Sequence, residues 1–239
     1  MLGEPQLLRK AVAEFLGTAF LLLAVIGSGI AASRLSPHDT GLALLENAIA
    51  TGGALVAIIL AVGPVSGSHL NPVVTIADLA FGGLSRAAAA VYVVGQLLGA
   101  AVGAILANLI YGLQWISTST HDRSSPSLWL SEVVATLGLL LVIFGVVRSR
   151  RAGLAPFAVG AYITGAYFFT SSTSFANPAV TVARSLSNTF AGIAPTSVPM
   201  FLIAQMVGCG VAIATVRYLY PHVHEEADEL VVPHQATNR

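Results

Sequence analysis

The sequence has 239 residues, of which 55% are hydrophobic and only 9% are charged, and its mean hydropathy is +0.80. A soluble domain carries about 25% charged residues, so this composition indicates a membrane protein and excludes an ordinary soluble domain. Lys and Arg together number 11, as do Asp and Glu, so the net charge gives no sign of a nucleic-acid partner.

Six stretches are long enough to cross a bilayer, for which about 20 apolar residues suffice. In chain order they are 12–32, 42–62, 87–111, 128–147, 154–171 and 198–219. The first follows Arg9 and Lys10 but runs for a full span without a clear cleavage site, so we expect a retained helix. The sequence therefore predicts an all-α membrane protein.

Two polar strings interrupt the apolar pattern, after the second and the fifth span. They read SGSHLNPVVTIAD at 66–78 and STSFANPAVTVARS at 172–185. Their Asn-Pro pairs lie 106 positions apart, at Asn71-Pro72 and Asn177-Pro178. Because Asn suits the N-cap of a helix and Pro its first residue, we expect half-helices near 71–80 and 177–187.

Basic residues indicate the orientation, because they gather on the cytoplasmic side of a membrane. With the N-terminus inside, eight of them are cytoplasmic: Arg9, Lys10, Arg86, Arg148, Arg150, Arg151, Arg217 and Arg239. Three fall outside: Arg34, Arg123 and Arg184. We therefore expect both termini in the cytoplasm, including the tail at 221–239. His222 and His224 in this tail could bind a metal, but the acidic residues around them favour a solvated segment.

The chain divides into two matching halves, 1–120 and 121–220. Glu14 and Glu132 each precede a Thr by four positions, the Asn-Pro segments match, and Gln96 matches Gln205. Since the fourth span starts outside and the first starts inside, this repeat is inverted. Inverted repeats with broken helices place the functional site near the membrane midplane.

The interruptions themselves indicate an aqueous path. Irregular backbone at membrane depth is tolerated only where protein buries it or water reaches it. If each Asn oxygen caps its own helix, the side-chain NH₂ remains as a donor toward a passing solute. The two helix N-termini also bring partial positive charge, about +0.5 each, which opposes cations but not neutral molecules.

These residues resemble the major intrinsic protein family, the aquaporins and aquaglyceroporins, from Glu14 to about Tyr220. The resemblance implies an aquaporin-like inverted repeat of six transmembrane helices plus two re-entrant half-helices, with one pore per subunit. It further implies a homotetramer in the lipid bilayer, which we expect to be a bacterial inner membrane. No enzymatic activity, cofactor, metal or nucleic acid is expected.

The resemblance also implies roles for individual positions. Asn71 and Asn177, with Pro72 and Pro178, would form the central constriction, and His69 would lie on its cytoplasmic side. Glu14 and Glu132 resemble the buried acids that hold backbone N–H groups of the two re-entrant loops.

The outer constriction departs from the family pattern. Counting from the two Asn residues places it at Thr51, Gly165, Ser174 and Val180. Water-selective members typically have Phe, His, a small residue and Arg there, and glycerol facilitators have Trp, Gly, Phe and Arg. We therefore expect a wide filter without the usual Arg, similar to the valine-bearing bacterial aquaporins associated with arsenic handling. Arg184 either restores positive charge at the outer mouth or caps the short helix.

The expected function is a passive channel for small neutral solutes, such as glycerol, urea or arsenous acid, together with water. A water-selective aquaporin is one alternative, and an ion-coupled secondary transporter is another. Coupled transport needs an ionisable group in mid-membrane, and only Glu14 and Glu132 are candidates. A sealing or adhesion role without transport fits poorly with a path lined by Ser, Gly and Asn.

Overall fold

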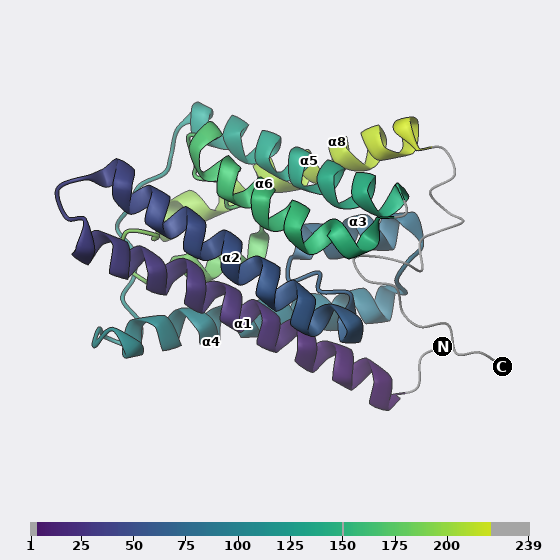
Figure 1. Ribbon diagram of the computed structural model, residues 1–239, viewed down its shortest axis with the longest axis horizontal. Helices are drawn as coiled ribbons and strands as arrows, with labels where there is room; N and C mark the ends of the chain where they lie inside the picture. The colour runs from purple at the N-terminus through teal and green to yellow at the C-terminus, as the bar shows by residue number, and fades with distance from the viewer. Residues whose placement is uncertain (1–3, 150, 221–239) are drawn as a thin grey trace.

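Six long helices carry the hydrophobic part of the chain, and two short ones lie between them (Figure 1). The computed structural model describes residues 4–149 and 151–220. The long helices are α1 (Glu4–Leu35), α2 (Thr40–Ser66), α4 (Arg86–Ile110), α5 (Pro126–Arg148), α6 (Ala155–Phe169) and α8 (Val198–Leu219). Single 3₁₀ turns, Ala152–Leu154 and Pro195–Ser197, precede α6 and α8. The tail at 221–239, which includes His222, His224 and Arg239, lies outside the described residues, as does Arg150.

The short helices begin where the Asn-Pro pairs predict. They are α3 (Pro72–Phe81) and α7 (Pro178–Arg184), each with Asn at the N-cap and Pro at the start. Gly82 ends α3 in the left-handed conformation, with φ of 92°, which glycine adopts at no steric cost. The second half-helix ends at Arg184, three residues before the predicted position 187.

Six helical segments of the described chain, 18 to 30 residues long, are apolar enough to cross a membrane. Large apolar side chains such as Phe20, Ile49, Leu98 and Phe169 are exposed on their outer surfaces, where a soluble protein would carry polar groups. The prediction of an integral membrane protein is therefore confirmed.

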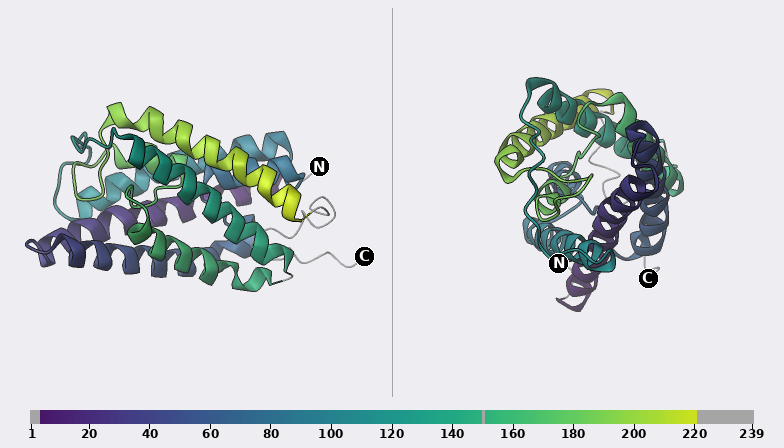
Figure 2. Two further views of the ribbon diagram at one scale, coloured as in Figure 1. Left: turned by 90° about the horizontal axis from the view of Figure 1, so that it is seen from above. Right: turned by 90° about the vertical axis from the view of Figure 1, so that its left-hand side faces the viewer.

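The two halves repeat one packing plan. In the first half α1 packs along α2 and α4; in the second α5 packs along α6 and α8. Helices α2 and α6 join the halves. In Figure 1, α1 and α5 run in opposite directions, and α1 begins at the end of the bundle where α8 ends. Seen end-on, the long helices cross at an angle around the loops that carry the short helices (Figure 2). This arrangement confirms the inverted repeat.

Glycines allow the closest helix contacts. A Cβ added at Gly99 or Gly103 of α4 would overlap a carbonyl oxygen of α1, that of Phe15 or Ala19. The matching residue of α8, Gly208, lies so close to α5 that its Cβ would come within 2.6 Å of the Val133 oxygen. The backbones of the paired helices are therefore nearly in contact, as small residues permit in membranes.

Gly99→Ala is expected to destabilise the protein by about 1–3 kcal/mol, because α1 and α4 must move apart to admit the methyl group. The matched control is Gly53→Ala in α2, where an added Cβ meets nothing within 4 Å. Thermal unfolding in detergent should show a lower midpoint for the first variant alone. Equal midpoints would contradict the close packing.

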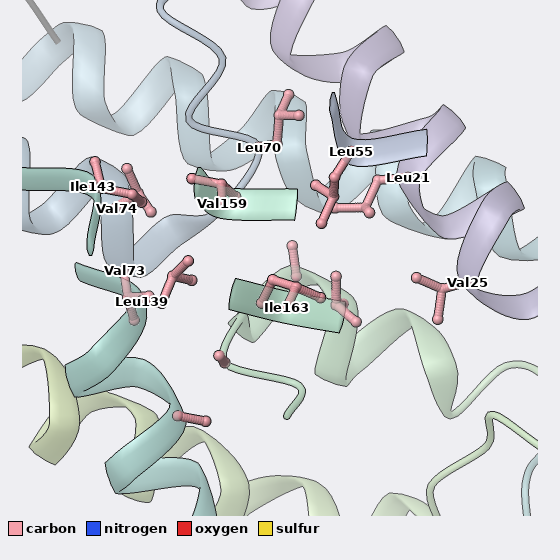
Figure 3. Packing of buried hydrophobic residues seen from close by; sticks show 14 of the residues in the cluster. Leu21, Val25, Leu55, Leu70, Val73, Val74, Leu139, Ile143, Val159 and Ile163 are labelled. Carbon is pink, nitrogen blue, oxygen red and sulfur yellow. The ribbon is translucent and has the colours of Figure 1, made fainter. Parts of the chain in front are cut away.

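The interior between the halves is apolar. Figure 3 labels residues of this cluster from both halves: Leu21, Val25, Leu55, Leu70, Val73, Val74, Leu139, Ile143, Val159 and Ile163. The two short helices therefore lie in a hydrophobic environment, where every backbone polar group of their loops needs a partner.

Candidate functional site

The loops before α3 and α7 share a strained backbone. Ser68 and Ser174 have φ of 51° and 50°, and Leu70 and Ala176 have φ of 52° and 46°. Left-handed backbone costs a residue with a Cβ about 1–3 kcal/mol, so it persists only where the surroundings impose it. The same distortion at the same places in both halves indicates that the loop shape is functional.

A buried glutamate imposes that shape in the first half. One carboxylate oxygen of Glu14 accepts hydrogen bonds from the Ser66 hydroxyl (2.6 Å) and the His69 N–H (2.9 Å). The other accepts from the Leu70 N–H and the Gln96 side chain, both at 2.7 Å. This carboxylate therefore satisfies loop N–H groups that the distorted backbone leaves without intrahelical partners.

Glu132 repeats this role in the second half. It accepts from the N–H groups of Phe175 (2.9 Å) and Ala176 (2.8 Å) and from the Gln205 side chain (2.6 Å). Each glutamine amide also donates to a threonine of the adjacent half-helix, Thr75 or Thr181. In the sequence the glutamines indicate only the repeat, whereas in the structure they extend the hydrogen-bond network around both loops.

The two asparagines meet across the interface of the halves. The side-chain oxygen of Asn71 accepts from the Val73 N–H (3.0 Å), and its NH₂ donates to the Ala176 carbonyl (2.8 Å). The NH₂ of Asn177 donates in turn to the Leu70 carbonyl (2.8 Å). Each amide is thus held at both ends. One N–H of each NH₂ binds the opposite half, which leaves the other as a donor.

One cavity contains both asparagines and residues on either side of them. Ser68 and His69 line it from the first loop, and Ser174 and Phe175 from the second. Its remaining lining is mainly apolar, and includes Leu21, Val25, Leu55, Ile59, Val74, Leu139, Ile143, Val159 and Ile163. Apolar walls with a few fixed polar groups are typical of a selective binding or conduction site.

Three of the four residues expected at the outer constriction line this cavity together: Thr51, Ser174 and Val180. The fourth, Gly165, does not. It lies exposed on the outside of α6, whereas Ile163 and Tyr167 line the cavity. Residues 163 and 167 share a helix face, and 165 lies about 200° around the helix from 163. The loop to Asn177 is two residues shorter than the count assumed.

Tyr167 therefore takes the place expected for Gly165. We call Thr51, Ser174, Val180 and Tyr167 the outer group. It is 3% exposed, and its hydroxyl donates to the Thr51 hydroxyl at 3.2 Å. The four residues predicted for the outer constriction include no aromatic side chain, whereas the α6 residue that lines the cavity beside Thr51 is a tyrosine. A tyrosine from α6 faces the small residues of α2, the second loop and α7.

Arg184 also lines the cavity, although it lies four residues beyond Val180. Its side chain is buried, its Nε donates to the Ala191 carbonyl, and its guanidinium carbon lies 3.4 Å from the centre of the Phe175 ring. The terminal amino groups have no acceptor among the described residues. They are the polar donors of Arg184 that remain for a solute.

On the inner side, the cavity-lining residue His69 contacts an acid instead. Asp78 precedes Arg184 by the same 106 positions that separate the asparagines. The Asp78 carboxylate lies 3.6 Å from His69 Nε2. In the second half, the corresponding residue Arg184 stacks on Phe175, which corresponds to His69. The two ends of the cavity therefore carry different side chains, an imidazole next to a carboxylate and a guanidinium next to a phenyl ring, although the backbone plan is the same.

Comparison with known proteins shows which family the sequence resembles. The family model described as Major intrinsic protein matches residues 1–174. Among curated relatives, the aquaglyceroporin AqpS of Rhizobium meliloti (strain 1021) is 47% identical over 216 residues, which cover 90% of this chain and 92% of the relative. The probable aquaporin TIP2-2 of Oryza sativa subsp. japonica is 31% identical, over 89% of this chain and 88% of the relative.

Among solved structures, the aquaglyceroporin from Plasmodium falciparum is similar, with a TM-score of 0.69 and 24% identity. The match covers 91% of this chain and 98% of that one. This likeness supports the fold: six spans with two re-entrant half-helices.

Proposed function

Because this chain belongs to the major intrinsic protein family, we propose that it is a passive channel for small neutral solutes such as glycerol, urea and arsenous acid, together with water. It is a channel and not an enzyme. The observation that carries the proposal is the single cavity that contains the paired asparagines and an outer group without Arg at position 180. A relative at 47% identity is named an aquaglyceroporin, which supports the same solute class.

The outer group favours solutes larger than water. Thr51, Ser174 and Val180 are small, and among these four positions Tyr167 alone is aromatic, so three of the four side chains leave room for a solute. The hydroxyls of Thr51 and Ser174 can bond the oxygen atoms of a polyol or a metalloid hydroxide. Selectivity in such pores comes from diameter, hydrogen-bonding groups and electrostatic barriers, and here the first two are relaxed.

Positive charge favours neutral solutes over cations. Asn71 and Asn177 cap two helix N-termini that bring partial positive charge to the middle of the cavity. We propose that Arg184 adds a full positive charge at the outer mouth, in place of the missing filter Arg.

Ion-coupled transport is less well supported. Glu14 and Glu132 do not line the cavity, and their oxygens accept hydrogen bonds that support the loops. Among the described residues, His69 is the titratable group that lines the inner side of the cavity. A water-selective aquaporin remains the alternative within the family.

The same proposal covers the assembly and its location. We propose a homotetramer with one pore per subunit, placed in a bacterial inner membrane with both termini in the cytoplasm. The apolar outer surface of α1 and α4, with Val12, Val94 and Leu98, is available for lipid or for a neighbouring subunit.

Val180→Arg is expected to slow glycerol and arsenous acid at least about tenfold while water flow continues, because a long cation enters a group of small residues. Swelling of reconstituted vesicles in gradients of water, glycerol, urea and arsenous acid measures this. Ala179→Ser, at a buried neighbouring position that does not line the cavity, is the control. Unchanged glycerol flux in Val180→Arg would show that position 180 does not limit the pore.

A further inference from the structure

The hydrogen-bond plan of the two re-entrant loops differs between the halves at one donor. In the first half, the Tyr92 hydroxyl donates to the Ser66 carbonyl at 2.7 Å. The residue at the matching place of α8 is Phe201, which follows Tyr92 by the same 109 positions that separate Gln96 from Gln205. Phe201 has no hydroxyl, so the carbonyl of Ser172, the counterpart of Ser66, needs another donor.

Arg123 supplies that donor. Its Nη1 donates to the Ser172 carbonyl at 3.3 Å. Arg123 belongs to the connection between α4 and α5, which is not part of either set of repeated helices. Two further hydrogen bonds fix its position. Its backbone N–H donates to the Ser197 hydroxyl and its Nε to the Gly192 carbonyl, both at 3.0 Å.

The aromatic pair behind each loop has the same geometry in both halves, but the side chains that form it differ. His69 meets Tyr92 edge to face at 5.3 Å, and its counterpart Phe175 meets Phe201 edge to face at 5.1 Å. The ring of Phe175 therefore occupies the place that the imidazole of His69 occupies in the first half, and it lines the cavity.

Two guanidinium groups lie against the ring of Phe175. The guanidinium carbon of Arg184 lies 3.4 Å from its ring centre, and that of Arg123 lies 5.0 Å from it. Cations within about 6 Å of an aromatic ring centre are attracted to its face. Among the described residues neither guanidinium forms an ion pair with a carboxylate, and the negative charge of Glu132 acts on both only from a distance. Both positive charges therefore lie beside the outer mouth and are only partly offset.

We propose that Arg123 is a positioning and specificity-determining residue of the outer filter. It fixes the second re-entrant loop through the Ser172 carbonyl, as the Tyr92 hydroxyl fixes the first, and it adds a second positive charge beside Arg184. Arg123 does not line the cavity, so it acts on solutes through Phe175, Arg184 and its own field. The filter therefore repels cations with two charges while neutral solutes pass.

This inference rests on the proposed function, and the chain offers a pair of variants that separate its two parts. Arg123→Ala with Phe201→Tyr restores a hydroxyl donor for Ser172 but not the charge. Arg123→Lys keeps the charge but loses the planar fork that bonds two carbonyls at once. Phe201→Tyr alone is the control for the added hydroxyl.

Glycerol flux and potassium leak are measured in vesicles for the wild type and each variant, with thermal midpoints in detergent. Arg123→Ala should raise potassium leak about tenfold and lower both glycerol flux and the midpoint. The double variant should regain glycerol flux and midpoint while the leak stays high. Arg123→Lys should show low leak with a reduced midpoint.

The inference is overturned if the double variant regains cation exclusion, since Arg123 would then act only as a brace. It is also overturned if Arg123→Ala leaves the leak unchanged. Should Arg123→Ala not fold, the double variant and Arg123→Lys still decide, because they are expected to fail in opposite readouts. A wild type that does not pass glycerol would instead reject the proposed function.

Discussion

Glu14→Ala is expected to prevent accumulation of a stable folded protein. The variant removes the acceptor of four hydrogen bonds, two of them from backbone N–H groups in a buried loop. Each donor left without a partner costs about 1–3 kcal/mol, and whole domains are stable by about 5–15 kcal/mol. Yield of monodisperse protein in detergent and its thermal midpoint measure the effect.

Two related variants grade this prediction. Glu14→Gln keeps one side-chain acceptor and should lose less stability than the alanine variant. Glu132→Ala removes the acceptor of three hydrogen bonds instead of four. Its loss of stability should lie between those of Glu14→Gln and Glu14→Ala, or equal that of Glu14→Ala. A Glu14→Ala protein with the midpoint of the wild type would show that the loop keeps its shape without the carboxylate.

Arg184→Ala is expected to raise cation leak at least about tenfold and to broaden solute preference, since a barrier of about 1.4 kcal/mol corresponds to a factor of ten. The reason is its position. Arg184 is only 2% exposed, lines the cavity with Val180 and Ser174, and its terminal amino groups have no acceptor among the residues that the structure describes.

The matched control is Arg34→Ala, which removes the same charge from an exposed position where the guanidinium binds the Tyr111 carbonyl and ring. Potassium leak and solute swelling in vesicles compare the two. If both variants leak equally, general surface charge sets the barrier. If Arg184→Ala matches the wild type, its role is limited to the end of the short helix.

The fold was predictable because each of its features has a local signal. Span length follows from apolar runs, and the half-helices follow from Asn-Pro, since Asn caps and Pro starts a helix. Hydropathy detects only the membrane-crossing part of a helix. For that reason the first span was placed at 12–32, whereas α1 runs from Glu4 to Leu35.

The outer filter was less predictable, because it depends on how far a loop reaches. Counting back from Asn177 gave Gly165, but a count cannot detect a loop that is two residues shorter. The spacing of Val159, Ile163 and Tyr167, each four residues apart, was a usable signal for the inner face of α6. An added Cβ at Gly160 would come within 2.8 Å of the Gly52 oxygen, and this contact fixes the register of α6 against α2.

Arg184 and Arg123 illustrate two degrees of predictability. Helical side chains lean toward the N-terminus, so the direction of Arg184 could be inferred from its place on the half-helix. Arg123 contacts Ser172 across 49 positions and from the connection between α4 and α5, and no spacing in the sequence relates the two. The missing hydroxyl of Phe201 becomes meaningful only when both halves are compared in three dimensions.

The central claim is passive conduction of neutral solutes through the cavity that holds Asn71 and Asn177. Light scattering of vesicles containing the wild-type protein, mixed with a glycerol gradient, tests it most directly. A passive channel predicts shrinkage followed by rapid re-swelling at a rate that is the same with and without a proton gradient. Shrinkage with re-swelling no faster than in empty vesicles, or re-swelling that requires a proton gradient, would contradict it.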